Sequence, residues 1–366
     1  MKTHRQLYPR LCSFENIYRA YRAARRGKRG HTGVADFEFN QEAELLRLRD
    51  ELQTQTWQPG PYHSFYLHDP KRRLISAAPF RDRVAHHALV NIIEPIWETR
   101  FIHDTYANRA GKGTHAALDR CQQFARRWPY VLQCDIQQFF PAIDHTLLLS
   151  QLARHLGDEA VLKLCDRILA SGAGVLAEVY TMRWFAGDDL FASGRPRGLP
   201  IGNLTSQFWA NVYLNDFDHF VKRELKCAGY VRYVDDFLLF GSDKSKLHRW
   251  RAVLDEQLAE LRLTLHVGRA QVFPVTTGIP FLGFRVYPTH RRLKRRNGVN
   301  FQRRLPGLLQ RLFDDVVSPL VGEANGHKAR YYNLHASVLG WVNHARHGDT
   351  YGLRRAVLGR WPVRGP

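Results

Sequence analysis

The sequence is poor in cysteine, in acidic residues and in long apolar runs. Its 366 residues include five cysteines, which are scattered along the chain without a C-x-x-C pair. Scattered cysteines argue against a zinc site or a disulfide framework and fit a reducing compartment, so we expect a cytoplasmic protein. No stretch approaches the roughly 18 apolar residues of a membrane span, and residues 1–5 lack the apolar core of a secretory signal. We therefore expect no membrane partner.

The shortage of acids leaves a large positive charge. The chain has 34 Asp and Glu against 54 Lys and Arg, which gives a formal net charge of +20. Residues 1–36 hold nine basic residues against two acids, and residues 285–366 hold sixteen against four. The long segment between them is nearly neutral. Two basic ends around a neutral middle predict a polyanionic partner, a nucleic acid, more readily than a generic solubilising surface.

Two adjacent carboxylates stand in the neutral middle. Asp235 and Asp236 interrupt the apolar and aromatic stretch 230–240, which predicts two short buried strands that meet at the acids. Like charges repel each other, and burial penalises each of them further. A divalent cation would relieve both costs, because hard cations bind carboxylate oxygens.

A third acid ends a separate apolar run. Residues 130–136 predict a strand, and Asp135 lies at its end. An acid in this position is ready to meet the Asp235–Asp236 turn if the strands belong to one sheet. The three acids are therefore the candidate metal ligands.

Two further acid pairs are weaker candidates. Asp188 and Asp189 lie in a Gly-rich stretch without a long apolar strand before them, so we interpret them as a loop pair. Asp314 and Asp315 fall in an amphipathic helical pattern, which is typical of a solvated helix face.

A basic hairpin is predicted upstream of these acids. Two β-like runs flank a turn at Asp69-Pro70, and the tip and return strand carry Lys71, Arg72 and Arg73. Lys and Arg bind phosphate strongly, so the hairpin is a candidate phosphate clamp. A solvated charged turn is an equally good interpretation of these residues alone.

Helical patterns and a glycine loop complete the outline. We predict an amphipathic helix over 38–53 with Asn40 as its N-cap, and a strand over 263–266. A Gly/Pro loop opens a helix predicted over about 204–227, and Gly202 in that loop would let a ligand approach the backbone closely.

As an ordered set, these segments resemble reverse transcriptases of the bacterial lineage related to group II introns. The resemblance covers roughly residues 60–350. Tyr233–Asp236 resembles the catalytic box, and Cys134–Phe140 resembles the palm strand that supplies the third acid. Phe281–Phe284 resembles the primer grip, and Ser337–Ala345 resembles the C-terminal segment of the subfamily found in diversity-generating retroelements.

The resemblance implies a fold and its subdomains. The fold would be α+β, a right-hand polymerase with fingers, a palm whose antiparallel sheet is flanked by helices, and a helical thumb. The implied subdomains are a basic helical extension (1–60), fingers (61–129), palm (130–287, with a fingers insertion at about 158–198) and a basic thumb (288–366).

The resemblance also implies the chemistry of an RNA-directed DNA polymerase. Two Mg²⁺ ions, with Mn²⁺ as a substitute, would lie about 3.5–4 Å apart. Their ligands would be Asp135, Asp235 and Asp236, with the Ile136 carbonyl as a backbone ligand. Phe140 would lie under the incoming sugar and favour dNTP over rNTP, although a core aromatic is the alternative interpretation.

Further roles come from the same resemblance. The dNTP would be bound by the fingers hairpin, with Arg73 as the first candidate for its triphosphate. It would also be bound by Ile201 and Gly202, whose loop would contact the templating pair. The primer would be held by the turn at Phe281, Leu282 and Gly283. The implied partners are template RNA, the RNA–DNA hybrid, dNTPs and a small basic oligomeric accessory protein, the accessory variability determinant.

Three positions depart from the pattern of most relatives. Ile201 stands where they have Gln, and Gln207 stands where they have Pro. This variant is similar to enzymes of diversity-generating retroelements, which copy template adenines with errors, so it implies mutagenic retrohoming. Arg269 replaces a Lys, which puts a general-acid role at that position in doubt because Arg stays protonated.

Two alternatives stay open. One is a related group II intron-like, retron or host-defence reverse transcriptase; since the sequence ends at Pro366, we do not expect a complete mobile-intron protein. The other is a non-catalytic RNA-binding or maturase-like protein. The three intact acids argue against the second alternative, because a pure binder has no need of them.

Overall fold

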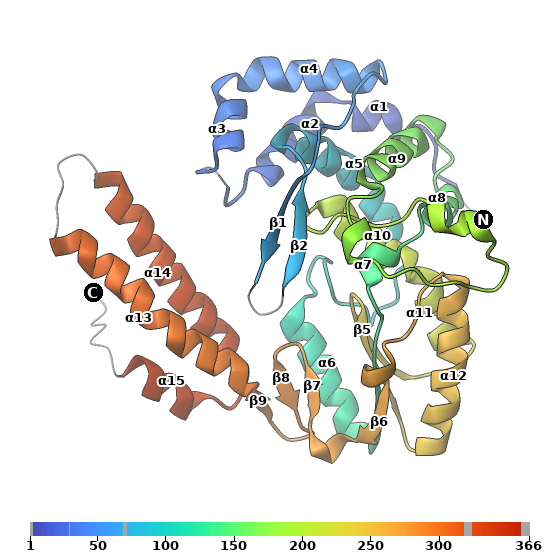
Figure 1. Ribbon diagram of the computed structural model, residues 1–366, viewed down its shortest axis with the longest axis vertical. Coiled ribbons are helices and arrows are strands. Elements are labelled where there is room, and N and C mark those ends of the chain that lie inside the picture. Colours follow the sequence, from blue (N-terminus) through green and yellow to red (C-terminus); the bar gives the residue numbers. More distant parts are fainter. Residues whose placement is uncertain (1–2, 29, 69–71, 318–323, 360–366) are drawn as a thin grey trace. The chain divides into compact units, whose positions relative to one another are not determined.

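The computed structural model describes residues 3–28, 30–68, 72–317 and 324–359 (Figure 1). The strands are β1 (His63–Leu67), β2 (Arg73–Ala77), β3 (Tyr130–Asp135), β4 (Gly229–Tyr233), β5 (Asp236–Gly241), β6 (Gln271–Pro274), β7 (Ile279–Phe281), β8 (Phe284–Val286) and β9 (Arg291–Leu293). The α-helices are α1 (Tyr8–Leu11), α2 (Phe14–Ala24), α3 (Thr32–Phe39), α4 (Gln41–Gln53), α5 (Phe80–Glu98), α6 (Thr114–Arg127), α7 (Phe139–Ala142), α8 (His145–Ala153), α9 (Glu159–Gly172), α10 (Leu204–Tyr213), α11 (Asn215–Arg223), α12 (Lys244–Glu260), α13 (Arg295–Val317), α14 (Ala324–Ala345) and α15 (Tyr351–Leu358).

The chain forms two compact units. Unit 1 contains residues 1–113, 132–239 and 245–271. Unit 2 contains residues 114–131, 240–244 and 272–366. Among the described residues, no helix combines the length and apolar composition that a membrane span requires.

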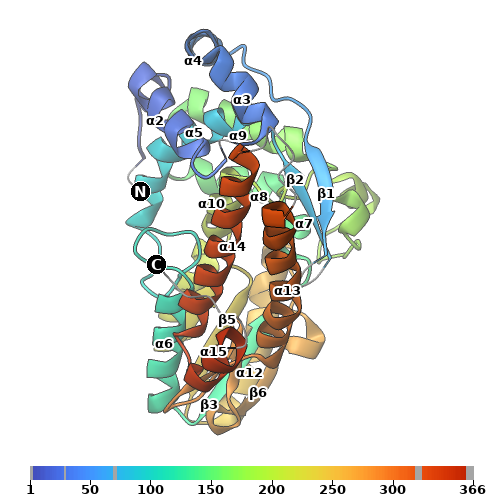
Figure 2. The same cartoon turned by 90° about the vertical axis from the view of Figure 1, so that its left-hand side faces the viewer.

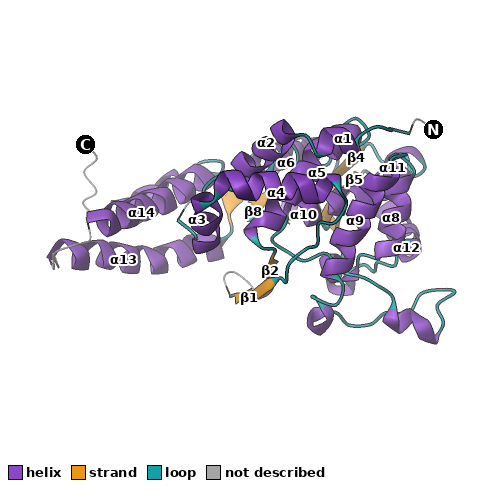
Figure 3. Cartoon of the chain, turned by 90° about the horizontal axis from the view of Figure 1, so that it is seen from above, coloured by secondary structure: helices purple, strands orange, loops and turns teal. Residues whose placement is uncertain are grey.

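Helix α5 lies at the centre of the helical part of unit 1. It packs against α2 on one side and α10 on another, which explains why its apolar residues are buried around most of its circumference. Figure 3 draws all helices in purple and labels α2, α5 and α10 among them. The antiparallel hairpin β1–β2 extends from this helical body in Figure 1 and pairs Leu67 with Arg73 at its far end.

A four-stranded sheet has the strand order β4-β5-β3-β6. Its inner strands β3 and β5 are nearly continuous apolar runs, as expected for strands that are buried on both faces. Because β3 and β5 are neighbours, the end of β3 can lie beside the β4–β5 turn. Asp135 lies at the end of β3, and Asp235 and Asp236 lie at the β4–β5 turn. These are the three acids that the sequence predicts as metal ligands.

Unit 2 combines a small sheet with a helical cluster. Strands β7, β8 and β9 pair antiparallel, and α6 packs against β8. Helices α13 and α14 lie side by side (Figure 2), and the Phe301 and Trp341 rings stack at 4.3 Å between them. Val357 of α15 joins the same buried cluster.

Two helix predictions need correction. The predicted helix 38–53 is two helices, because α3 ends at Phe39 and α4 begins at Gln41. Asn40 is the N-cap residue of α4, as predicted, but its side chain makes no capping hydrogen bond. The predicted helix 204–227 is also divided, at Leu214, and ends at Arg223.

The division at Leu214 has a local cause. Helix α10 is buried on almost all sides, whereas α11 is amphipathic and begins with Asn215 and Asp216. Such residues favour helix starts because their side chains compete for backbone hydrogen bonds. The predicted strand 263–266 is also wrong: within it, Leu265 forms an isolated bridge to Ile136 and no strand.

Candidate active site

The turn between β4 and β5 consists of Val234 and Asp235. Val234 has a φ of +58°, in the left-handed region. Two-residue hairpin turns favour positive φ because it matches the strand twist. A β-branched residue rarely adopts this conformation, so the turn must be stabilised by its surroundings.

The end of β3 meets this turn. The Ile136 N–H donates a hydrogen bond to the Asp235 carbonyl oxygen, at 3.1 Å. The N–H and C=O of a residue in an extended segment point to the same side of the chain, so the Ile136 carbonyl also faces the turn. Asp135, Ile136 and Asp235, three of the four predicted metal ligands, therefore lie together.

The carboxylates of Asp135 and Asp235 influence each other. Burial, and then the negative charge of Asp135, raise the pKa of Asp235 to about 6. Arg73 and Arg269 oppose this rise in pKa with their positive charges. The Arg269 guanidinium also forms an ion pair with Asp135 Oδ2. Positive charge is thus favourable at this place in the molecule.

Asp236 begins β5 and is the third acid. The Gln133 side-chain amide donates to Asp236 Oδ1 at 3.4 Å. Gln133 and Asp135 are two residues apart on β3, so their side chains share a face of the sheet. The side chains of Asp135 and Asp236 therefore lie on one face of the sheet, and the Gln133 contact holds Asp236.

The donor set fits Mg²⁺. In the part of the chain that the structure describes, no three His, Cys, Asp or Glu side chains converge closely enough to hold a metal ion by themselves. Mg²⁺ does not need such a cage, because it binds one or two carboxylates and completes its shell with water and substrate phosphates. The repulsion between Asp135 and Asp235, and the cation that already pairs with Asp135, fit a site for divalent metal.

The loop before α10 packs against the β1–β2 hairpin. The Ser76 N–H on β2 donates to the Ile201 carbonyl oxygen at 2.9 Å. Gly202 has a φ of +116°, and a Cβ there would lie 3.0 Å from Ile75 Cγ2. Glycine is required here by both its backbone conformation and this close approach. Ile201 and Gly202 thus lie beside the strand that carries Arg73.

Phe140 is joined to the same loop. The Leu199 N–H donates to the Phe140 carbonyl oxygen at 2.9 Å. The Phe140 ring is half-buried, whereas its neighbour Phe139 is the buried core aromatic. The structure therefore brings Phe140 and the predicted template loop together and leaves the Phe140 side chain accessible.

Asn203, which the sequence patterns did not mark, holds this loop in place. Its side-chain amide donates to the carbonyl oxygens of Ser76 (2.8 Å) and Pro200 (3.0 Å), and its Oδ1 accepts from the Ala78 N–H. An Asn that follows Gly at a helix start was the available signal. Gln207 lies one turn further along α10, and its N–H bonds to the Asn203 carbonyl oxygen.

The basic residues of the hairpin point in different directions. Arg72 lies over the Tyr66 ring, with its guanidinium carbon 3.9 Å from the ring centre. Arg73 is the next residue on β2 and acts on the charge of Asp235. Lys71 lies outside the described residues.

The predicted primer grip is a tight turn in unit 2. Leu282 and Gly283 have φ values of +44° and +88° and join β7 to β8. The Asn297 side-chain amide donates to the Gly283 carbonyl oxygen at 3.3 Å. A Cβ at Gly283 would lie 2.8 Å from that same nitrogen, so glycine lets the turn pack closely, and Phe281 before it is buried.

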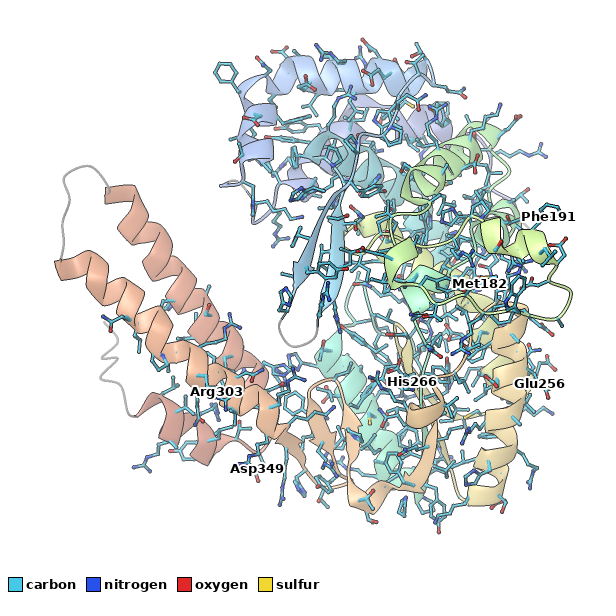
Figure 4. All side chains as sticks on the ribbon, in the orientation of Figure 1. Met182, Phe191, Glu256, His266, Arg303 and Asp349 are labelled. Atoms are coloured by element: carbon cyan, nitrogen blue, oxygen red, sulfur yellow. The ribbon has the colours of Figure 1, made fainter. Side chains whose placement is uncertain are left out.

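The other acid pairs have structural contacts. Asp188 forms an ion pair with Arg195, and Asp189 caps a short helical turn by accepting from the Phe191 N–H. Both lie in the long connection between α9 and α10, where Figure 4 labels the exposed Phe191. The interpretation as a loop pair is confirmed. Asp314 and Asp315 belong to α13, and their side chains lie outside the described part of the structure.

A buried charge network next to the β4–β5 turn was also missed. The Arg232 and Asp218 side chains are both 0% exposed and form an ion pair. A charged residue inside the apolar run 230–240 was the signal for it, since buried charges are rare unless paired.

The sheet, the turn with its acids and the surrounding helices define a polymerase of the right-hand class. Residues 68–286 match the family of reverse transcriptases (RNA-dependent DNA polymerases). The chain belongs to this family, and the matched residues are its reverse transcriptase domain. The predicted α+β right-hand polymerase fold is confirmed. Enzymes of this family use divalent metal, template RNA and dNTPs.

Two curated relatives illustrate the lineage. Protein YkfC of Escherichia coli (strain K12) is 26% identical over 288 residues, which are 66% of this chain and 71% of YkfC. The group II intron-encoded protein LtrA of Lactococcus lactis subsp. cremoris is 24% identical over 183 residues, 49% of this chain and 28% of LtrA. The predicted relationship to group II intron enzymes is confirmed at this level.

Solved telomerase structures share a weak likeness. Telomerase from Candida albicans, in complex with a TWJ fragment of telomeric RNA, matches 84% of this chain and 64% of its own, with 11% identity and a TM-score of 0.45. Apo telomerase from Candida tropicalis matches 65% and 49%, with 8% identity and a TM-score of 0.47. Likeness at this level carries no argument about this chain.

Proposed function

We propose that this protein synthesises cDNA on a template RNA at the Asp135–Asp235 site. The observation that carries the proposal is the meeting of the two acids, joined by the Ile136-to-Asp235 hydrogen bond and marked by the raised pKa of Asp235. Perturbed carboxylates beside cationic groups are typical of functional sites. Asp236, on the same face, is the third acid of the proposed site.

Asp135, Asp235 and Asp236, with the Ile136 carbonyl, would hold two Mg²⁺ or Mn²⁺ ions. Bound metal would activate the primer 3′-hydroxyl and stabilise the departing pyrophosphate. The carboxylates would keep the reacting oxygens in position. Arg269 would give up its contact with Asp135 as metal and substrate enter, since its side chain is half exposed.

The incoming nucleotide would be held by the fingers hairpin and by Phe140. Arg73 would bind the triphosphate, since its charge already acts on Asp235. Lys71 and Arg72 would assist it. The accessible Phe140 ring would lie beneath the sugar and disfavour a 2′-hydroxyl, and the Leu199 contact supports this position.

The template loop suggests a mutagenic enzyme. We propose that Ile201 and Gln207 reduce discrimination at template adenines, as in diversity-generating retroelements. Ile201 has no side-chain hydrogen-bonding group, so the loop lacks the polar contact that Gln would supply. A small basic oligomeric accessory protein would then be a partner, and the products would include an RNA–DNA hybrid.

The subdomain boundaries and the location also stay predictions. We propose a basic extension over 1–60, fingers over 61–129, a palm over 130–287 and a thumb over 288–366, with Phe281, Leu282 and Gly283 at the primer. All five cysteines are buried and none forms a disulfide, in keeping with a reducing cytoplasm.

Primer extension on an RNA template tests the proposal. Wild type should yield Mg²⁺-dependent cDNA, and Asp135→Asn should remove it. Asp189→Asn is the matched control, because that acid lies in the α9–α10 connection and caps a surface turn. Absence of cDNA from wild type, with and without added protein partners, would contradict the polymerase proposal.

The fidelity proposal has its own test. Sequencing of cDNA from an adenine-containing template should show errors concentrated at adenines. Ile201→Gln should reduce them severalfold, while Ile201→Val should not. Accurate copying by wild type would favour a related group II intron-like, retron or host-defence enzyme. Tight RNA binding without any nucleotide transfer would instead favour the non-catalytic RNA-binding alternative.

A further inference from the structure

The guanidinium of Arg232 lies directly beneath the catalytic turn. Its Nε and Nη2 donate to the two carboxylate oxygens of Asp218, at 2.7 and 2.6 Å. Its Nη1 donates to Asn211 Oδ1 at 3.2 Å and to the Val234 carbonyl oxygen at 3.0 Å. The Tyr230 hydroxyl donates to Asp218 Oδ1 at 2.8 Å. A planar, forked cation can make these contacts together, and an ammonium cannot.

The contact with Val234 acts on the catalytic residue that follows it. The Val234 carbonyl belongs to the peptide group that links Val234 to Asp235, so a bond to its oxygen restrains the φ angle of Asp235. The Asp235 carbonyl belongs to the next peptide group, and it accepts the bond from Ile136 N–H. Both peptide groups around the Asp235 Cα are therefore held, one by Arg232 and one by β3.

The held conformation is an unfavourable one. Val234 has a φ of +58°, which a β-branched residue avoids. Strained backbone persists only where the surroundings over-determine it. The Arg232–Asp218 pair is also a costly way to fill a core, because replacing a buried ion pair with apolar residues is often neutral or stabilising. Its cost is understandable if the pair fixes the geometry of the turn.

We propose that Arg232 is a positioning residue of the polymerase site. Anchored by Asp218 and Asn211, it holds the Val234 carbonyl and the left-handed turn, and thereby aims the Asp235 carboxylate at bound metal. This inference rests on the proposed metal-dependent function. It assigns Arg232 no contact with substrate.

Arg232→Lys tests the proposal, because it keeps the charge next to Asp218 but cannot reach both Asp218 and Val234. Binding of Mn²⁺ to the full chain without nucleotide can be followed by electron paramagnetic resonance. We expect the Kd for Mn²⁺ to rise about 10- to 100-fold, as for other groups that orient metal ligands. The kcat for nucleotide addition should fall, while the KM for dNTP stays within about twofold of wild type.

Two variants separate positioning from stability. Tyr230→Phe removes a hydrogen bond to Asp218 but none to Val234, so it should lower the urea midpoint and leave Mn²⁺ affinity unchanged. Val234→Gly, added to Arg232→Lys, should recover part of the lost affinity, since glycine adopts positive φ without strain. If Arg232→Lys does not fold, Asp218→Asn keeps one acceptor oxygen and should give an intermediate loss of affinity.

The outcomes are distinguishable. Unchanged Mn²⁺ affinity in folded Arg232→Lys or Asp218→Asn overturns the positioning role and leaves the proposed function intact. If Tyr230→Phe loses as much Mn²⁺ affinity as Arg232→Lys, the positioning role is overturned as well, because the loss of affinity then follows the loss of stability. A wild-type chain that binds no Mn²⁺ and makes no cDNA refutes the proposed function, and the positioning role with it.

Discussion

Two arginine–aspartate pairs adjoin the catalytic turn and differ in burial. Arg232 and Asp218 have side chains that are both 0% exposed, and the pair contacts Asn211 as well. Arg269 and Asp135 have side chains that are 47% and 21% exposed. The same two chemical groups therefore meet once in the core and once at the surface of the site.

The difference in burial separates a fixed contact from an exchangeable one. An exposed ion pair contributes little stability, because water and salt screen it. Arg269 can leave Asp135 at small cost when a metal ion and a triphosphate compete. A buried pair cannot separate without stranding a charge, so Arg232 stays in place through the reaction. In the proposed function, the core pair would fix the geometry of the turn, and the surface pair would keep the acids compensated before substrate arrives.

Loss of a catalytic acid should have the largest effect. Asp235→Asn keeps the size of the side chain but removes a metal ligand, so single-turnover nucleotide addition should fall by about 10³-fold or more. Its urea midpoint should change little or rise, because the repulsion with Asp135 disappears. A variant that retains more than a tenth of the wild-type rate would contradict the assignment of Asp235.

Breaking the core pair should have the next largest effect. Arg232→Met leaves the Asp218 carboxylate buried without its partner, and the free energy of unfolding should fall by about 3–5 kcal/mol. Equilibrium urea unfolding measures this. Arg232→Met combined with Asp218→Leu removes both charges and should restore most of the stability but not Mn²⁺ affinity. Recovery of both properties would mean that the pair has no positioning role.

A buried histidine without hydrogen-bond partners shows what burial does to an ionisable group that is not paired. His86 on α5 is buried, neither ring nitrogen has a hydrogen-bond partner, and burial lowers its pKa to about 3. In the unfolded chain His86 has a pKa near 6.5 and binds a proton below that pH, whereas in the folded chain it stays neutral down to about pH 3. The free energy of unfolding therefore falls as the pH drops from about 6.5 toward 3. At pH 5 the loss from this group should be about 2 kcal/mol.

His86→Leu should flatten the acid side of the stability curve, measured by urea unfolding between pH 7 and pH 5. His248→Gln changes an exposed histidine on α12 and serves as the control. An unchanged pH dependence in His86→Leu would show that other groups dominate acid unfolding.

Removal of the surface pair should have the smallest effect on stability. Arg269→Gln should change the free energy of unfolding by less than about 1 kcal/mol. It should also tighten the binding of Mn²⁺ to the protein without nucleotide, because a competing cation is lost from Asp135. Weaker Mn²⁺ binding in this variant would contradict the exchange of Arg269 for metal.

The candidate acids were predictable because local patterns mark them. Asp135 ends one apolar run and Asp235-Asp236 interrupt another, and each pattern specifies a strand and its acidic end. The fingers hairpin was predicted for the same reason, and β1 and β2 confirm it. The divided helices were not predicted, since the breaks at Asn40 and Leu214 depend on competing helix ends and on packing.

Long-range contacts were beyond the reach of pattern alone. Asn203 joins the template loop to β2, and Arg232 joins Asp218 on α11 to the turn at Val234. The Asn203–Ser76 contact spans 127 residues and the Arg232–Asp218 contact spans 14. Each involves a polar group whose value comes from the partner it meets after folding.

The sequence alone determined the family, the basic ends and the identity of the three acids, because residue type and local periodicity carry that information. Only the tertiary structure decided how the acids are held. The neighbouring positions of β3 and β5 bring Asp135 beside Asp235, and a buried cation restrains the strained Val234. Burial and neighbouring charge are properties of the folded chain, and they set the pKa of Asp235.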